Sequence, residues 1–475
     1  MNYDIVIGIE IHLELKTKTK MFSDAYIDMS SSANSHCNEI DFALPGVLPT
    51  VNKDAIKKAV IACNALNMNI NDTLVFDRKN YYYSDLPKGY QITQQYNPIG
   101  TNGYLDLYDD SNFTINIDRL HIEEDTAKQY HQYDNTLIDF NRAGIPLIEI
   151  VTKPEFNSSK QVKIYLEYIK RLFVYLDISD AKMELGSMRC DINISLKLKD
   201  TKVLGNKVEI KNLNSISNAI KAIEYEIIRQ SRLLDNNQII ISETRRYDEE
   251  LKETISMRNK ETTIDYKYFL DPNIYPIKLS KDIINDSINE IPISFKDTIN
   301  KYLNYNLVLN EIYYLLDNPL LLEYFNQTIK VCNDYRLVYN FLTSKLLGLL
   351  TKYNIQIKDL KITPNNIGQL LNYIIDKTIS TKQSNEILEK MINGDTPKEI
   401  INKYNYSLNS NQQEIIDYIN QAIQENPQSI IDYQNGKDRA IGFIVGQVMK
   451  KTKGQANPAL TNQLVLQIFN KSINQ

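Results

Sequence analysis

Two strand-like segments each carry a histidine beside carboxylates. In the first, DIVIGIEIHLEL at residues 4–15, strand side chains alternate between two faces. Alternation places Glu10, His12 and Glu14 on one face and the apolar side chains on the other. One face is therefore suited to a protein core, and the other could chelate a cation.

The second segment is RLHIEEDTAK at residues 119–128. Alternation puts His121, Glu123 and Asp125 on one face and Glu124 on the opposite face. A further acid, Glu149, interrupts the apolar run IPLIEIV, where an unpaired buried charge would be costly. For any one of these residues taken alone, an ion pair or a solvated face is the simpler interpretation.

Taken together, the acids and the first histidine form a candidate site for a hard metal ion. Carboxylate oxygens with one imidazole suit Mg²⁺ or Mn²⁺ better than zinc, whose structural sites favour thiolates. Mg²⁺ usually takes one or two protein carboxylates and fills the remaining positions with water and substrate phosphates, so not every acid need be a ligand. The candidates are Glu10, His12, Glu123, Glu124 and Glu149.

A magnesium site suggests a nucleotide, but the sequence has neither a P-loop nor a G-x-G-x-x-G motif. Phosphates would then need cationic side chains. The segment FDRKNYYYSDLPKGYQITQ supplies Arg78, Lys79 and Lys88, and Arg142 and Arg189 lie in other strand-like runs. Such groups are usually solvated surface, so composition alone does not establish a phosphate site.

Length and composition predict a soluble protein of two to four domains. The chain has 475 residues, of which 43% are hydrophobic, with a formal net charge of -5. We find no membrane span, signal peptide or C-x-x-C pair among its four cysteines, which we expect to be reduced thiols of a cytoplasmic protein. The acidic balance argues against DNA binding, and any RNA must be held by a local basic patch.

The elements that position these residues fall into an α+β arrangement. Up to about residue 290, short alternating segments predict a large, mostly antiparallel curved sheet, interrupted by helices at residues 52–68 and 158–178. From about residue 295 the apolar residues recur at helical spacing, as in TPNNIGQLLNYIIDK. We therefore expect a catalytic sheet domain at 1–293, a helical domain at 294–405 and a small helical tail at 406–475.

Nine motifs in order resemble the B subunit of the aspartyl/glutamyl-tRNA amidotransferase, from near residue 3 to near residue 470. They are VIGIEIHLELKTKTKMFS, LPGVLPTVNKDAIKKAVIACNALN, RKNYYYSDLPKGYQITQ, RLHIEEDTAK, NRAGIPLIEIVTKPE, GSMRCDINISL, EIKNLNS, ETRRYDE and GQANPAL. The resemblance implies a cradle-shaped catalytic domain. It also implies that ATP phosphorylates the side-chain carboxylate of mischarged Glu-tRNA(Gln) or Asp-tRNA(Asn), and that ammonia then displaces the phosphate.

The resemblance also implies roles for particular residues. Glu10, His12, Glu124 and Glu149 would lie around the magnesium, with Glu123 and Asp125 close behind, and His12 and Glu124 are the first candidates for catalysis. Because Glu124 and His121 lie on opposite faces, we expect His121 to pack structurally. We assign Lys79, Arg142 and Arg189 to the ATP phosphates or to the substrate carboxylate, because they sit inside family motifs.

The resemblance implies partners as well. The chain has no Ser-Ser-Lys amidase signature and no Cys-His arrangement for opening glutamine, so ammonia must come from an amidase A subunit, with a small C subunit completing a heterotrimer. The tail would hold the tRNA through Lys437, Arg439, Lys450, Lys451 and Lys453. Cys37 stands alone where many relatives carry paired zinc-binding cysteines, so we expect no structural zinc.

Two rival interpretations stay open at this point. Clustered acids with a histidine also build two-metal phosphoesterases. Alternatively, the chain could be a non-catalytic scaffold that carries tRNA and docks an amidase, with its acids in ion pairs. The sequence does not distinguish tRNA(Gln) from tRNA(Asn) as substrate, nor a bacterial cytoplasm, which we take as the default, from an organelle with an AT-rich genome.

Overall fold

The computed structural model describes residues 3–107, 112–201, 203–259, 265–291, 294–404, 406, 411–452 and 455–473. The chain divides into two compact units, Met1–Thr298 and Ile299–Gln475. The expected domain boundaries at 293/294 and 405/406 each involve a residue, 293 or 405, that lies outside the described residues. The three-domain division therefore stays a prediction.

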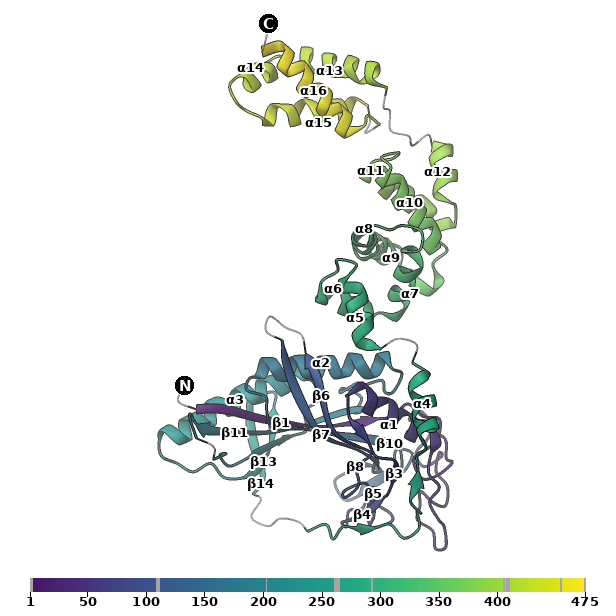
Figure 1. The fold of residues 1–475 in the computed structure, drawn as a ribbon, viewed down its shortest axis with the longest axis vertical. Coiled ribbons are helices and arrows are strands. Elements are labelled where there is room, and N and C mark those ends of the chain that lie inside the picture. Colours follow the sequence, from purple (N-terminus) through teal and green to yellow (C-terminus); the bar gives the residue numbers. More distant parts are fainter. Residues whose placement is uncertain are drawn as a thin grey trace. The chain divides into compact units, whose positions relative to one another are not determined.

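A nine-stranded sheet dominates the first unit (Figure 1). Its order is β14-β13-β12-β11-β1-β10-β7-β6-β2, and every neighbouring pair is antiparallel except β12 and β13. This confirms the expected large, mostly antiparallel sheet. The strands are β1 (Tyr3–Glu14), β2 (Asn69–Ile70), β6 (Gly100–Leu107), β7 (Phe113–Glu124), β10 (Pro146–Thr152), β11 (Met188–Leu198), β12 (Val208–Lys211), β13 (Glu243–Asp248) and β14 (Glu253–Asn259).

The central strand β1 has the two faces that its sequence predicts. Ile9, Ile11 and Leu13 are at most 1% exposed. Helices α1 (Lys53–Ala65), α2 (Ser159–Tyr175) and α3 (Ile216–Asp235) lie on one side of the sheet (Figure 1). Apolar side chains spaced three and four residues apart let such helices pack on a sheet. The polar side chains of β1 therefore face the other side.

Local sequence fixes where these helices begin and how closely they pack. The side chain of Asn52 accepts hydrogen bonds from the first turn of α1, and Ser158 does the same for α2. Gly103 of β6 lets this strand approach the segment after α1, because a Cβ at Gly103 would lie 2.5 Å from Met68 Cγ. The layer of helices thus packs directly on the sheet.

Smaller sheets lie on the polar side of the large one (Figure 1). Gln94, just after β5, accepts a hydrogen bond from the backbone N–H of Ile122 in β7, and Gln91 of β5 donates one to the carbonyl of Glu124. These bonds fix the small sheet over the end of β7. The sheets are β15-β4-β5, β16-β3 and β8-β9, built from β3 (Thr73–Leu74), β4 (Asp77–Asn80), β5 (Tyr90–Thr93), β8 (Lys128–His131), β9 (Thr136–Asp139), β15 (Phe269–Leu270) and β16 (Ile277–Lys278).

The rest of the described chain is helical, as the change of period predicts. Helix α10 buries Ile367, Leu370 and Leu371, whereas Ile375 at the end of this helix is 46% exposed. The helices are α4 (Lys281–Asn289), α5 (Phe295–Leu303), α6 (Leu309–Leu316), α7 (Pro319–Thr328), α8 (Tyr335–Asn340), α9 (Leu347–Tyr353), α10 (Pro364–Ile375), α11 (Thr381–Lys390), α12 (Pro397–Tyr404), α13 (Gln412–Glu425), α14 (Gln428–Gln434), α15 (Arg439–Lys451) and α16 (Pro458–Ile473).

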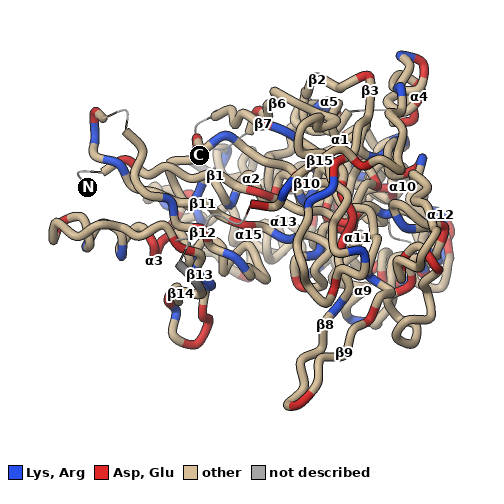
Figure 2. Tube along the Cα trace, turned by 90° about the horizontal axis from the view of Figure 1, so that it is seen from below, with Lys and Arg blue, Asp and Glu red and all other residues tan. Residues whose placement is uncertain are grey.

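The last four helices have a core of their own. Ile415 and Ile419 of α13 pack with Ile444 and Val448 of α15 and with Phe469 of α16. In the described part of the chain, we find no helix with the length and apolar character needed to cross a membrane. Figure 2 shows Lys and Arg interspersed with Asp and Glu along the trace, in keeping with the small net charge.

Candidate active site

Four charged or ionisable residues form a row across the polar face of the large sheet. His121 of β7 is opposite Glu149 of β10, which is opposite His12 of β1, which is opposite Arg189 of β11. Directly opposed residues in antiparallel strands have side chains within contact distance. The register of four strands therefore gathers groups that lie up to 177 residues apart in the sequence.

Both histidines converge on the same carboxylate. The Nε2 atoms of His12 and His121 lie 3.2 Å and 3.0 Å from Oε2 of Glu149. Glu123 lies 3.5 Å from His12 and 3.7 Å from His121, and Glu10 lies 3.8 Å from His12. We call these five residues the acid–histidine cluster.

The acid–histidine cluster is largely withdrawn from water. Glu123 is 3% exposed and Glu149 is 7% exposed. Burial alone would raise the pKa of Glu149, but His121 and His12 hold it well below its usual value. Burial would likewise lower the pKa of each histidine, yet the carboxylates raise the pKa of His12 to about 9 and that of His121 to about 10. Carboxylates and histidines thus stabilise one another's charged forms.

The donor atoms suit a hard divalent cation. Two groups have ligand atoms within 4.8 Å of one another, namely Glu10 with His12 and Glu149, and His121 with Glu123 and Glu149. Three carboxylates, and two imidazoles once a cation has displaced their Nε2 protons, supply the oxygen and nitrogen donors that Mg²⁺ or Mn²⁺ accepts. The structure therefore brings together three of the four expected metal ligands.

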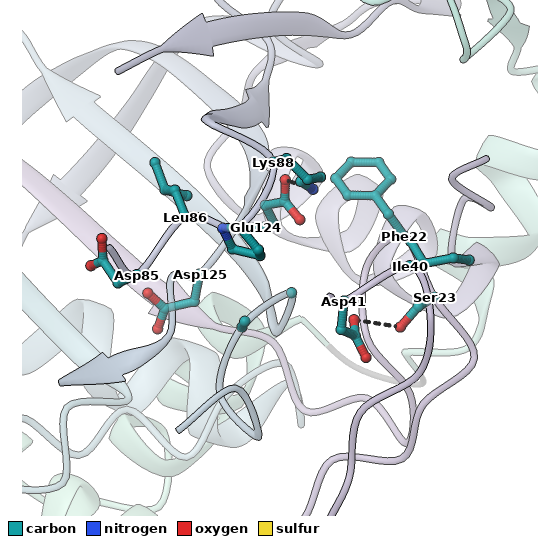
Figure 3. Close-up of a pocket in the computed structure, with 12 residues that line it drawn as sticks. Phe22, Ser23, Ile40, Asp41, Asp85, Leu86, Lys88, Glu124 and Asp125 are labelled. Carbon is teal, nitrogen blue, oxygen red and sulfur yellow. Dashed lines mark hydrogen bonds and ion pairs between the residues drawn. The ribbon is translucent and has the colours of Figure 1, made fainter. Parts of the chain in front are cut away.

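Glu124, the fourth expected ligand, lies elsewhere. It belongs to neither group that the described residues form. Its carboxylate pairs with Lys88 and accepts a 3.0 Å hydrogen bond from the backbone N–H of Ile92. Figure 3 shows Lys88 and Glu124 pointing toward one another in a pocket that Asp125 also lines. The ammonium of Lys88 therefore already neutralises the charge of Glu124 in this structure.

The expectation that His121 packs structurally stays a prediction, and the structure adds ionic contacts to it. Alternation correctly separates His121 from Glu124, but the register of β7 with β10 places His121 against Glu149. Sequence reasoning missed this contact, because periodicity does not reveal which residue lies across the strand. Lys88 was a cationic candidate in the sequence, but nothing there indicated its pairing with Glu124.

Of the three expected cationic residues, Lys79 and Arg189 border the acid–histidine cluster. Burial would lower the pKa of Lys79, but the negative charges of Glu123 and Glu149 raise it, so its ammonium is within electrostatic reach of these carboxylates. Arg142 and Arg189 meet instead at Asp125, whose Oδ2 lies 3.5 Å from Arg142 Nε and 2.8 Å from Arg189 Nη2. Asp125 thus forms ion pairs with Arg142 and Arg189, the two arginines that we assigned to the ATP phosphates or the substrate carboxylate.

The pairing of Asp125 with Arg189 is incomplete. Among the described residues, Asp125 Oδ2 and the Nε and Nη2 atoms of Arg189 are buried without a hydrogen-bond partner, although the ion pair is short. Burial and the Asp125 charge raise the pKa of nearby Glu14 to about 7. Buried polar groups normally find partners, so this spot is suited to an additional polar ligand.

The loop that carries Cys37 is held by protein contacts. Cys37 Sγ lies 3.7 Å from Asn141 Oδ1. Lys20, fully buried, lies 3.1 Å from Asp41, which also accepts a hydrogen bond from Ser23 (Figure 3). The metal-ligand groups that the described residues form contain no cysteine. The absence of a structural zinc stays a prediction.

Comparison with known proteins covers nearly the whole chain. A model of the GatB/GatE catalytic domain matches residues 5–285, and a model of the GatB domain matches residues 323–469. The chain is 44% identical to a protein of Mesoplasma florum, with 99% of each chain covered. It is 43% identical to one of Mycoplasma capricolum, covering all of this chain and 99% of that protein. A Bacillus cereus protein is 40% identical, with coverage of 99% and 100%. All three are named as the B subunit of an aspartyl/glutamyl-tRNA(Asn/Gln) amidotransferase.

Proposed function

This chain belongs to the GatB/GatE family, and on that premise we propose that it is the tRNA-binding and carboxylate-activating subunit of a tRNA-dependent amidotransferase. Its substrates are mischarged Glu-tRNA(Gln), Asp-tRNA(Asn) or both. The observation that carries the proposal is the acid–histidine cluster, with Lys79 and Arg189 beside it and Arg142 paired with Asp125. We place the protein in the cytoplasm and its large sheet in the family's cradle-shaped catalytic domain.

The reaction has two steps. A side-chain carboxylate oxygen attacks the γ-phosphorus of ATP, which releases ADP and leaves an acyl phosphate. The nitrogen of ammonia then adds to the acyl carbon, and phosphate leaves with the carboxylate oxygen that formed the bridge. Phosphorylation is needed because a carboxylate lacks a good leaving group. Positioning and charge neutralisation are the main tasks of a protein in phosphoryl transfer.

Glu10, His12 and Glu149 are the residues that we propose to hold Mg²⁺. When bound, the cation would neutralise phosphate charge next to the attacking carboxylate. Glu123 and His121 contact one another, and His121 contacts Glu149 and orients it. Glu124 becomes a ligand only when its ion pair with Lys88 opens.

Lys79 and the two arginines bind the anionic groups of the substrates. Glu123 and Glu149 raise the pKa of Lys79, so we propose that its ammonium also attracts a phosphate bound at the cation. Arg142 and Arg189 offer planar guanidinium groups that can bind carboxylate or phosphate by two parallel hydrogen bonds. We propose that a substrate anion takes over part of their bonding from Asp125.

Ammonia has to come from a partner. Cys63, Cys190 and Cys332 are buried, and burial raises the pKa of each thiol, so none is suited to attack glutamine. We propose that an amidase A subunit supplies ammonia and that a small C subunit completes a heterotrimer. An enclosed path would protect the acyl phosphate from hydrolysis.

We propose that the tail holds the tRNA, although its charge is partly neutralised. Lys437 lies 3.1 Å from Asp432, and Lys451 lies 2.5 Å from Glu425. These acids come from α14 and α13, outside the basic stretch of sequence. The remaining members of the predicted patch are Arg439, Lys450 and Lys453, the last of which lies outside the described residues.

The test is release of phosphate from ATP by the complex with its amidase and small subunit, with and without Glu-tRNA(Gln). We expect hydrolysis that depends on the mischarged tRNA and is lost in His12→Ala. His131→Ala, which changes an exposed histidine of β8, is the matched control. Hydrolysis indifferent to tRNA would favour a phosphoesterase, whereas an active His12→Ala variant would favour a tRNA-carrying scaffold.

A further inference from the structure

Five tyrosines form a continuous run of ring contacts beside the acid–histidine cluster. Tyr81 packs edge-on against Tyr83 and Tyr266, with ring centroids 5.7 Å and 5.8 Å away. Tyr266 packs against Tyr268 at 5.9 Å, and Tyr268 against Tyr96 at 6.3 Å. We call these five residues the tyrosine track.

Two short strands hold the tyrosine track together. Tyr81 and Tyr83 follow β4, and Tyr266 and Tyr268 precede β15, which pairs with β4. The backbone N–H of Asn80 donates a 2.9 Å hydrogen bond to the carbonyl of Tyr266. Segments distant in the sequence are thus joined at this edge of the small sheet.

The inner part of the tyrosine track adjoins the proposed reaction site. The Tyr81 hydroxyl donates to Gln91, whose side-chain amide donates to the backbone carbonyl of Glu124. Lys79 Nζ lies 5.0 Å from the centroid of the Tyr266 ring and 5.9 Å from that of Tyr81. The ammonium of Lys79 thus contacts two rings of the track and is also within electrostatic reach of Glu123 and Glu149.

The outer members of the track are open to solvent. Tyr83 is 58% exposed and Tyr96 is 64% exposed, whereas Tyr81, Tyr266 and Tyr268 are half-buried. An edge-on contact uses the rim of one ring and leaves ring faces available. Large exposed aromatic side chains next to charged groups are the arrangement with which proteins stack unpaired bases.

We propose that the tyrosine track stacks the adenine base of a substrate whose reacting end lies at the acid–histidine cluster. This inference rests on the proposed function and deepens it. An aminoacyl group is esterified to the ribose of a terminal adenosine, so the base lies only a few bonds from the carboxylate to be activated. ATP presents the same base at the other end of its phosphates. The terminal adenosine of tRNA and ATP both present adenine, and the two experiments below determine which of them binds to the track.

Charge favours a nucleotide over a protein partner on this surface. Arg78 stacks on Tyr90, 4.0 Å from the ring centroid, and Lys79 lies between two rings of the track. Cations interleaved with aromatic rings can bind phosphates and bases together.

The first test uses tryptophan fluorescence, since the chain contains no tryptophan. Tyr83→Trp places a single reporter on the track, and Tyr275→Trp places one at an 87% exposed control position. Each full-length variant is titrated with the trinucleotide CCA and, separately, with ATP and Mg²⁺. We expect saturable quenching at position 83 only. Quenching by CCA assigns the base to tRNA, and quenching by ATP assigns it to the nucleotide. Equal or no response at both positions overturns the proposal.

The second test measures kinetics in the complete complex. Tyr83→Leu should raise the KM of one substrate, aminoacyl-tRNA or ATP, by about 5- to 150-fold, the range expected for losing one base stack, while Tyr83→Phe stays close to wild type. Tyr275→Leu is the matched control. If the wild-type complex transamidates and Tyr83→Leu leaves both KM values unchanged, the stacking proposal fails while the proposed function stands. If the wild-type complex shows no tRNA-dependent ATP hydrolysis, the proposed function itself fails.

Discussion

His12 and Glu149 are cross-strand partners in β1 and β10, and Nε2 of His12 lies 3.2 Å from Oε2 of Glu149. The same oxygen lies 3.0 Å from His121, so one carboxylate joins two histidines from opposite sides. Glu149 is 7% exposed and interrupts an otherwise apolar strand. Such a costly placement is expected where a carboxylate has a chemical task.

Replacing Glu149 by glutamine keeps the size of the side chain but removes its charge, and should therefore impair the metal site. For Glu149→Gln we expect tRNA-dependent ATP hydrolysis to fall by about 100-fold or more and the Mg²⁺ concentration for half-saturation to rise, because a charged ligand is lost. The measurement is a Mg²⁺ titration of hydrolysis. Glu155→Gln, a change of a nearby exposed carboxylate, is the control. An unchanged Mg²⁺ requirement would show that Glu149 is not a ligand.

The ion pair between Lys88 and Glu124 leads to a second prediction about the Mg²⁺ requirement. If Glu124 joins the cation when released from Lys88, Lys88→Met should lower the Mg²⁺ concentration for half-saturation several-fold, because an unpaired buried carboxylate gains more from a cation. Lys53→Met, which changes an exposed lysine, serves for comparison. A Lys88→Met protein that folds and keeps the wild-type Mg²⁺ requirement would leave Glu124 with a role in ion pairing alone.

A buried carboxylate far from the acid–histidine cluster predicts how stability depends on pH. Glu226 of α3 is fully buried, accepts two 2.9 Å hydrogen bonds from Arg229 and lies 3.2 Å from Arg245 of β13. Burial would raise the pKa of Glu226, but Arg229, with Thr254 and Gln230, holds it below its usual value of 4.5. A depressed pKa adds stability above the unfolded-state pKa, and this stability is lost as the pH falls through the folded-state pKa.

We therefore expect Glu226→Gln to lower the free energy of unfolding by about 1.5–3 kcal/mol at pH 7, because Arg229 and Arg245 lose one carboxylate partner and keep Glu243. The difference from wild type should shrink as the pH falls below about 4.5. Urea unfolding at several pH values measures this. Glu224→Gln, on the exposed side of the same helix, should change stability by less than about 0.5 kcal/mol. A pH-independent difference would contradict the assignment.

Two exposed glycines of α15 lead to the prediction that replacing one of them raises the stability of the tail and lowers its affinity for tRNA. A Cβ at Gly442 or Gly446 would meet no atom within 4 Å, so packing within the described chain does not explain glycine there. Glycine in a helix interior costs about 1 kcal/mol relative to alanine. Gly446→Ala should stabilise the tail by about this amount and weaken tRNA binding, if RNA packs on this face. Thermal unfolding and filter binding measure the two effects. Unchanged tRNA affinity would place the RNA elsewhere.

The sequence predicts the faces of β1 because the period of two is a local property. Ile9, Ile11 and Leu13 are buried as alternation requires, and His12 faces the opposite side. The register between strands is not local, so the contact of His121 with Glu149 could not be predicted from periodicity. The pairing of Lys88 with Glu124 likewise joins segments that lie far apart in the sequence.

Helix α3 is a further element that local sequence alone predicts. Helix α3 buries Ala219, Ala222, Ile223 and Ile227 at helical spacing, a pattern that predicts a helix directly. The roles of Arg142 and Arg189 came from the family motifs, and spacing alone would not have placed both guanidinium groups on Asp125. Local patterns thus predict elements and faces, whereas the site depends on contacts between distant segments.

The most direct test of the account follows one oxygen atom. Glu-tRNA(Gln) labelled with ¹⁸O in the side-chain carboxylate is given to the complete complex with ATP, Mg²⁺ and glutamine, and the released phosphate is analysed by mass spectrometry. An acyl phosphate intermediate requires one ¹⁸O atom in each phosphate released by amide formation, and none should appear with His12→Ala, which does not activate the carboxylate. Unlabelled phosphate formed together with Gln-tRNA(Gln) by the wild-type complex would contradict carboxylate phosphorylation by this chain.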